Sequence, residues 1–140
     1  MSRENVEVVR RGFEAFVEGI ERGDPIEAVF DAGVFAANAT LTPDRQRPDW
    51  KTHVGRDGLA HFLDAWTEDF SEWKLWPEEI LDAGGDRVVA VVRQSGKGKT
   101  SGAVVELHFG LVFTLEDGQV VDQREFLDPA DALEAVGLRE

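Results

Sequence analysis

The segment from Gln119 to Leu127 holds the residue best suited to acid–base chemistry. It reads as a strand and carries Gln123 and Glu125 two positions apart. Side chains alternate between the two faces of a strand, so these two residues share one face and Arg124 takes the other. A carboxyl group among apolar side chains can exchange a proton near neutral pH. The pattern alone leaves two interpretations of Glu125, a solvated surface charge or a pocket carboxylate.

The composition limits the classes of function. The chain has 140 residues, 42% of them hydrophobic, with nine Phe and four Trp, which is typical of one domain with a real core. A net charge of −13, from 28 acidic and 15 basic residues, argues against binding to nucleic acid or an anionic membrane. The absence of Cys excludes disulfides and thiolate chemistry.

No apolar run approaches the roughly 20 residues of a membrane-spanning helix. The polar N-terminal residues lead directly into a helical pattern, so no signal peptide is visible and we expect a cytoplasmic location. His53, His61 and His108 share no helical spacing of four, and no acidic partner is set by the sequence. We therefore expect no metal and no other cofactor.

Hydrophobic periodicity and turn residues divide the chain into alternating elements. We expect helices at 2–22, 25–31, 57–70 and 129–136, and strands at 34–41, 73–83, 87–95, 104–115 and 119–127. The polar residues 42–55 form a long loop, of the kind that is often functional or mobile. Strands joined by short turns pair antiparallel, and helices must cover one face, which predicts a single α+β domain over 1–140.

These segments, in this order, resemble the SnoaL-like branch of the nuclear-transport-factor-two-like superfamily. The segments that carry the resemblance are SRENVEVVRRGFEAFVEGIERGD, VGRDGLAHFLDAW, DAGGDRVVAVVRQSGKGKTSGAVVEL, FTLEDGQVVDQREF and LDPADALEAVGL. The resemblance implies a curved antiparallel sheet, shaped as a cone-like half-barrel, whose concave face is covered by about three helices around a pocket. It also implies a homodimer, commonly formed through the convex face of the sheet. Members include cyclases, isomerases, dehydratases, epoxide hydrolases and proteins without chemistry, so fold does not choose function.

Several residues acquire candidate roles through this resemblance. SnoaL-like cyclases carry an acid on the last strand that faces the pocket, and Glu125 falls at that position. Epoxide hydrolases of this fold place an arginine between two carboxylates on the long central strand, which Arg93 resembles after a shift of one residue. The companion acid two residues on would be Ser95, so the three-residue relay is incomplete. Arg93 is then a candidate counter-ion for Glu125, and a solvated arginine near the strand end is the alternative.

The constellation of the ketosteroid isomerases is absent. It requires a tyrosine, and this chain has none; its base on the first strand would fall at Ala36 or Ala37. Asn38 is the polar side chain near that position, and it either hydrogen-bonds a ligand or caps the end of the strand. In this fold the loop before the third helix borders the pocket opening, which makes His53 and Trp50 candidates for the pocket mouth.

The remaining pocket candidates come from the face on which they lie. Leu111 and Phe113 share the apolar face of their strand, opposite His108, and are expected in the core or pocket wall. Trp66 belongs to the apolar stripe of its helix, and Gln123 shares the face of Glu125. Trp73 and Trp76 point to opposite faces, so one is expected inside and the other toward a partner subunit.

We expect a protein with a pocket for a small apolar molecule. As an enzyme it would use Glu125 as acid or base, with Arg93, Gln123 and His53 orienting a carbonyl- or epoxide-bearing substrate, in a cyclisation, isomerisation, dehydration or hydrolysis. Two alternatives remain open: a binding domain without catalysis, and a dimeric scaffold whose pocket is filled by its own side chains.

Overall fold

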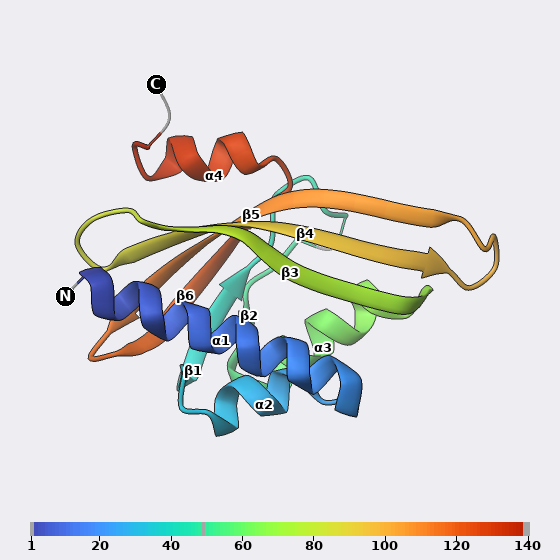
Figure 1. Ribbon diagram of the computed structural model, residues 1–140, viewed down its shortest axis with the longest axis horizontal. Coiled ribbons are helices and arrows are strands. Elements are labelled where there is room, and N and C mark those ends of the chain that lie inside the picture. The colour runs from blue at the N-terminus through green and yellow to red at the C-terminus, as the bar shows by residue number, and fades with distance from the viewer. Residues whose placement is uncertain (1, 49, 139–140) are drawn as a thin grey trace.

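A six-stranded sheet forms the centre of the computed structural model, which describes residues 2–48 and 50–138 (Figure 1). The strand order is β2-β1-β6-β5-β4-β3. The elements along the chain are α1 (Ser2–Arg22), α2 (Pro25–Asp31), β1 (Phe35–Thr42), β2 (His53–Val54), α3 (Gly55–Thr67), β3 (Phe70–Asp82), β4 (Arg87–Gly98), β5 (Val104–Glu116), β6 (Gln119–Phe126) and α4 (Pro129–Ala135). The sheet curves and does not close into a barrel, as the family resemblance implied.

The prediction of a fully antiparallel sheet is wrong at one position. β3 to β6 pair antiparallel through short turns, but β1 lies parallel to β6, with Leu41 opposite Gln123. Short connections dictate antiparallel pairing only for strands that are consecutive in sequence, whereas β1 and β6 are far apart in the chain. The two-residue strand β2, which falls in the predicted loop, pairs with β1 and leads directly into α3.

The helices occupy both faces of the sheet. In Figure 1, α1, α2 and α3 lie on one side and α4 lies on the other. Side chains alternate along β4 and so contact the helices on both faces. Val88, Ala90 and Val92 belong to the core beneath α1, while Val89 packs with Ala132 of α4. The expectation of about three helices on the concave face is confirmed, and the terminal helix is the one that covers the convex face.

Two boundaries differ from the predicted ones. The third helix begins at Gly55, two residues before Asp57, because extended Val54 belongs to β2 and the chain turns directly into the helix. β3 begins at Phe70, which the sequence pattern assigned to the preceding helix. The register between β3 and β4 shifts between Ser71 and Lys74, where Glu72 has a positive φ of 52°. An irregular strand of this kind obscures the two-residue period that identifies strands.

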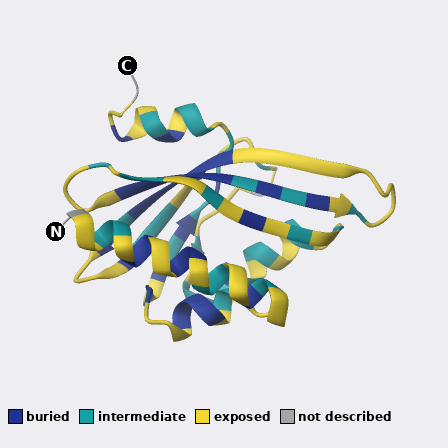
Figure 2. Cartoon of the chain, viewed as in Figure 1, coloured by how far each residue is buried: buried dark blue, intermediate teal, exposed yellow. Residues whose placement is uncertain are grey.

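Strands β4 and β5 extend beyond the helices. Figure 2 shows the far end of β5 exposed, while the middle of the sheet and the inner side of α1 are buried. Among the described residues, no helix is both long and apolar enough to cross a lipid bilayer. The largest apolar cluster of the structure lies on the concave face, under α1 and α3.

Candidate functional site

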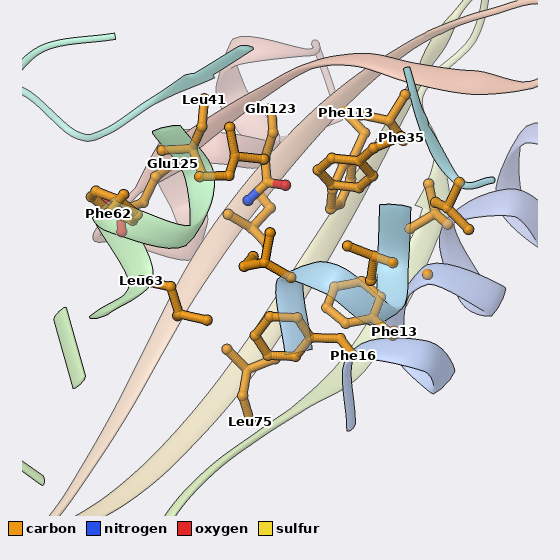
Figure 3. A pocket seen from close by; sticks show the side chains of 18 of the residues that line it. Phe13, Phe16, Phe35, Leu41, Phe62, Leu63, Leu75, Phe113, Gln123 and Glu125 are labelled. Carbon is orange, nitrogen blue, oxygen red and sulfur yellow. The ribbon is translucent and has the colours of Figure 1, made fainter. Parts of the chain in front are cut away.

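A cavity of about 100 Å³ lies between the concave face of the sheet and the helices (Figure 3). Its wall is almost entirely apolar, and eight aromatic side chains contribute to it: Phe13, Phe16, Phe35, Phe62, Trp66, Trp73, Phe109 and Phe113. The acid and amide side chains that line it are Glu125 and Gln123, adjacent inward positions of β6. Apolar walls with a few placed polar groups are typical of small-molecule sites.

Glu125 is a buried carboxylate. Its side chain is only 2% exposed, and the residue pairs with Leu111 across β5. Strand alternation turns Arg124 outward, where it is exposed, and turns Glu125 toward the cavity. A surface acid, one of the two interpretations of the sequence, does not describe this side chain.

Three hydrogen bonds hold the Glu125 carboxylate. Arg47 donates from Nε to Oε1 at 2.6 Å and from Nη2 to Oε2 at 2.8 Å, in the two-pronged geometry that a guanidinium offers a carboxylate. The backbone N–H of Asp44 donates to Oε1 at 3.0 Å. A carboxylate has about four acceptor positions, two on each oxygen. Both positions on Oε1 are thus engaged, and one on Oε2 remains for a further donor.

Aromatic rings hold the Arg47 guanidinium on its other side. Its central carbon lies 3.7 Å from the centroid of the Trp66 ring and 5.5 Å from that of Phe62. A cation over an aromatic face is attracted by the ring quadrupole, and more strongly when it is desolvated. Arg47 therefore joins the carboxylate on β6 to the aromatic face of α3.

Asp44 fastens the same loop to the end of β6. Its Oδ2 accepts a hydrogen bond from the Leu127 N–H at 2.8 Å, and its Oδ1 accepts one from the Gln46 N–H at 2.9 Å. Partial burial alone would raise the pKa of the Asp44 carboxyl. The backbone hydrogen bonds from Gln46 and Leu127, together with the charge of Arg47, outweigh burial and hold that pKa below its usual value.

The sequence pattern did not identify Arg47 or Asp44. Both lie in the 43–52 loop, which has no periodicity to orient a side chain, and Arg47 is 78 residues from Glu125. The usable signal was the length of this polar loop, which marked it as a functional segment without naming a residue.

Arg93 occupies a different place from the one predicted. It lies on the outer face of β4, where its Nε donates to Glu78 at 2.9 Å and its Nη1 to Glu106 at 3.5 Å. The inward positions on either side belong to Val92 and Gln94, both fully buried. The prediction that Arg93 is the counter-ion of Glu125 is therefore wrong, because strand alternation turns it away. Arg47 takes that place.

The other predicted site residues fall into two groups. Gln123, Leu111, Phe113 and Trp66 line the cavity together with Glu125, and their part in ligand binding stays a prediction. The second group lies outside the cavity wall and comprises Asn38, Trp50 and His53.

Each member of the second group has its own surroundings. Asn38 is exposed on β1. Trp50 is 43% exposed, beneath the guanidinium of Arg45. The ring of His53 lies 5.1 Å from that of Phe62, and burial, followed by the charges of Lys51 and His61, lowers the pKa of His53. Trp50 and His53 were inferred from the loop before α3, and Asn38 from the first strand. That loop reaches the site through Asp44 and Arg47 instead, and none of the three predicted side chains lines the cavity.

Within residues 2–48 and 50–138, no three His, Asp or Glu side chains gather closely enough to hold a metal ion. What the arrangement offers is a desolvated carboxylate with one open acceptor position at the edge of an apolar cavity.

Comparison with known proteins places the fold. Residues 13–123 match the family model of the SnoaL-like domain. This chain belongs to the SnoaL-like family. The superfamily resemblance seen in the sequence is thereby confirmed, and this SnoaL-like domain covers most of the chain. A search of curated proteins finds no match.

Solved structures with the same fold share about a fifth of the sequence. A candidate SnoaL-like polyketide cyclase from Jannaschia sp. CCS1 has a TM-score of 0.73 and 23% identity, covering 99% of this chain and 95% of its own. TerC, co-crystallised with polyporic acid, has a TM-score of 0.70 and 20% identity over 95% of this chain and 98% of its own.

A protein of ketosteroid isomerase-like fold from Catenulispora acidiphila, in complex with trimethylamine, has a TM-score of 0.67 and 15% identity over 94% and 93% of the two chains. At these identities the likenesses establish the fold and leave chemistry to the site itself.

Proposed function

We propose that this SnoaL-like protein binds a small, largely apolar molecule in its cavity and that Glu125 exchanges a proton with it. The observation that carries the proposal is the position of the carboxylate, 2% exposed and lining an aromatic wall. The reaction class is cofactor-free acid–base chemistry on a carbonyl- or epoxide-bearing substrate.

The open acceptor position on Oε2 gives Glu125 a route to act as a base. Arg47 and the Asp44 N–H fix the carboxylate plane, so the remaining lone pair on Oε2 has a set direction. A carboxylate held in one orientation needs little reorganisation when it accepts a proton from a bound molecule. The nearby charge of Arg47 stays in place during the transfer and helps to hold the site in one geometry.

Gln123 is the second polar group at this end of the cavity. It shares the inward face of β6 with Glu125, and Figure 3 shows its amide directed into the space between the aromatic rings. An amide both donates and accepts hydrogen bonds, so Gln123 can orient a carbonyl or epoxide oxygen next to the carboxylate. This pair replaces the predicted pair of Glu125 and Arg93.

The size of the cavity restricts the ligand. An engineered cavity of about 150 Å³ in another protein accommodates benzene, and this one measures about 100 Å³. By this comparison even one six-membered ring requires the cavity to expand, through movement of its lining side chains or of the 43–52 loop that Arg47 and Asp44 hold to β6. In solved structures of this fold, TerC was co-crystallised with polyporic acid and the Catenulispora protein is in complex with trimethylamine, which supports a small-molecule pocket here.

One observation favours a second candidate, a binding protein without catalysis. The carboxylate already accepts three hydrogen bonds, so it also serves to fasten the loop over the cavity. In that case Glu125 closes the site rather than reacting.

The two candidates are separated by Glu125→Gln, assayed with cyclohexene oxide and 3-cyclohexen-1-one as one-ring probes for hydrolysis and isomerisation. For an enzyme we expect turnover of at least one probe, a loss of about 10²- to 10⁴-fold in the variant, and little change in probe Kd. Binding with no turnover by the natural protein supports the second candidate. Equal rates in the protein and the variant contradict a catalytic Glu125.

We also propose that the chain forms a homodimer through the convex face. Trp76, Arg93 and His108 lie side by side across β3, β4 and β5 on that face, and Glu78 bonds to both Arg93 and His108. Trp76 is 37% exposed, an unusual position for so large an apolar surface unless a partner covers it. Light scattering should give twice the chain mass, and Trp76→Glu should give a monomer. A monomeric natural protein contradicts the proposal.

A further inference from the structure

Two hollows of the molecule meet at Trp73. One is the apolar cavity, and the other is a surface groove of about 530 Å³ between the last turns of α1 and the start of β3. Val17 and Ile20 of α1 line one side of the groove, and residues 72–76 of β3 line the other. Trp73 and Leu75 line both hollows, so these two residues form the partition between the cavity and the groove.

Trp73 is the movable part of this partition. Leu75 is only 8% exposed and pairs with Gln94 in the ladder between β3 and β4. Trp73 lies instead in a β-bulge, where it and Glu72 stand opposite the single residue Gly96. A bulge interrupts the ladder and changes the direction of a side chain. Pairing with β4 therefore holds the backbone of Leu75 in place but not that of Trp73.

No hydrogen bond anchors the indole of Trp73 within the described residues. Its Nε1 is buried and has no partner there. The ring meets that of Phe16 edge to face at 6.0 Å, and its Cδ1 lies 3.3 Å from where a Cβ on Gly96 would be. A buried donor without a partner is unfavourable, and turning the indole toward the groove exposes Nε1 to water. This hydration offsets part of the apolar contact that the ring loses when it moves.

The opposite wall of the cavity is fastened more firmly. Arg47 and Asp44 hold the 43–52 loop to β6 through four hydrogen bonds. Opening the cavity there breaks the buried ion pair of Arg47 with Glu125. Movement of the Trp73 side chain breaks no hydrogen bond of the described residues. The cavity therefore opens at a lower cost toward the groove.

We propose that Trp73 gates an opening between the cavity and the groove, and that the ligand is an elongated molecule that spans both. The cavity of about 100 Å³ must expand even for one six-membered ring, and displacement of the indole supplies that space. A ring then lies in the cavity, and an apolar chain passes Trp73 to reach Val17 and Ile20. The inference rests on the proposed function for the cavity itself and adds the way in and the shape of the ligand.

The opening lies far from the acid end of the cavity. Across β5, Glu125 stands level with Ala90 of β4. Leu75 pairs with Gln94, four residues along β4 from Ala90, which is about 13 Å at the usual rise per residue. Figure 3 likewise shows Leu75 across the cavity from Glu125. A ligand that enters past Trp73 thus presents its leading end to Glu125 and leaves its chain in the groove.

The test blocks the groove with a single cysteine, which the natural chain lacks. Val17→Cys places a thiol in the groove, and Trp50→Cys places one on the 43–52 loop as the matched control. The two native side chains are similarly exposed, at 39% and 43%. Each thiol is capped with benzyl methanethiosulfonate and released with dithiothreitol. The probes are cyclohexanone and 4-pentylcyclohexanone, which share the ring and carbonyl and differ by a chain.

We expect capped Val17→Cys to bind and release cyclohexanone about tenfold more slowly, measured by NMR exchange, with Kd unchanged. An obstacle in an entrance slows both directions equally. The natural protein should bind 4-pentylcyclohexanone at least about tenfold more tightly than cyclohexanone, because the groove buries part of the chain. Capping Val17→Cys should remove this advantage and dithiothreitol should restore it. Capping Trp50→Cys should change neither the rates nor the advantage.

The gate also has a readout that needs no ligand. The indole N–H signal of Trp73 is assigned by its loss in Trp73→Phe. We expect this N–H to exchange with D₂O much faster than the backbone N–H of Val92, which is fully buried on β4, because only the indole has to move. Capping Val17→Cys should slow the exchange of the indole N–H.

Three results overturn the proposal. Slower binding after capping Trp50→Cys but not Val17→Cys places the entrance at the loop. Equal Kd values for the two ketones restrict the ligand to the cavity. Indole exchange as slow as that of the Val92 N–H shows a fixed wall. Absence of binding by both ketones contradicts the proposed function and the elongated ligand, and the indole exchange then still decides whether Trp73 opens.

Discussion

Arg47 donates two hydrogen bonds, of 2.6 and 2.8 Å, to the carboxylate of Glu125, although 78 residues separate them in the chain. The pair is largely removed from solvent, with side chains 25% and 2% exposed. In such a place the cost of desolvating two charges offsets much of their attraction. The stability of the site therefore depends on both partners being present or both being absent.

A double-mutant cycle tests this dependence. Arg47→Leu leaves the Glu125 carboxylate buried without its counter-ion, and we expect a loss of about 3 kcal/mol in the free energy of unfolding. Glu125→Leu leaves the Arg47 guanidinium without its counter-ion, and we expect a similar loss in the free energy of unfolding. The double variant Arg47→Leu/Glu125→Leu should recover most of the loss, because no buried charge remains. Urea unfolding of the four proteins provides the free energies; additive losses would mean that the pair does not act as a unit.

The pKa of Asp44 predicts a dependence of stability on acidity. Its carboxyl has a lowered pKa in the folded protein, so its contribution is present above the unfolded value of 3.8 and is lost as the pH falls below 3.8 through the folded value. Asp44→Asn weakens the hydrogen bond from the Leu127 N–H and should lose about 1 kcal/mol at pH 7.

The difference in the free energy of unfolding between the natural protein and Asp44→Asn should decrease below pH 3.8. Comparing the two proteins cancels the titration of the other acidic groups. Urea midpoints at pH 7 and at successive steps below pH 4 give the result. A difference that stays constant with pH would show that the charge of Asp44 does not fasten the loop.

Protonation of His53 should lower the stability of the fold at a higher pH than protonation of Asp44 does, and for a different reason. Its pKa is lowered in the folded protein, first by burial and then by Lys51 and His61. Above the unfolded pKa of 6.5 both states are neutral and His53 contributes nothing. Below 6.5 the unfolded state binds the proton first, so folding is disfavoured as the pH falls.

Replacing His53 by Gln should therefore reduce the loss of stability between pH 7 and pH 5. Thermal midpoints across that range are the measurement. His61→Gln removes one of the charges that lower the pKa of His53, so it should weaken the contribution of His53 to this pH dependence without abolishing it. An identical pH profile for the natural protein and His53→Gln would contradict the lowered pKa.

The close packing of Gly110 against α4 leaves no room for a methyl group at this position, so Gly110→Ala should destabilise the fold. A Cβ at residue 110 would overlap Cβ of Ala132, which is 0% exposed, and would lie 3.3 Å from the Cα of Pro129. Gly110→Ala must displace α4 from the convex face, and overpacking of this kind costs about 1–3 kcal/mol. Adding Ala132→Gly should recover part of that loss in urea unfolding, less the helix penalty of about 1 kcal/mol for glycine. No recovery would place the strain elsewhere.

The sequence by itself determined the helices and the four consecutive strands, and it placed Gln123 and Glu125 on one face of β6; the family resemblance pointed that face inward. The elements and the shared face follow from short-range rules: periodicity, turn residues and the alternation of side chains along β6. The same local rules also placed Leu111 and Phe113 on the inward face of β5, where the structure has them. Arg93 was misplaced because its role was transferred from a resemblance that required a one-residue shift in register, and a one-residue shift reverses the face of a strand.

Only the tertiary structure decided which basic side chain pairs with Glu125. The 43–52 loop has no repeating pattern, so nothing local orients Arg47, and its partners on β6 and α3 are distant in the chain. The parallel pairing of β1 with β6 was hidden for the same reason, since no short turn joins them. Contacts between remote segments depend on how the whole chain excludes water from its aromatic core, and that is a property of the assembled fold.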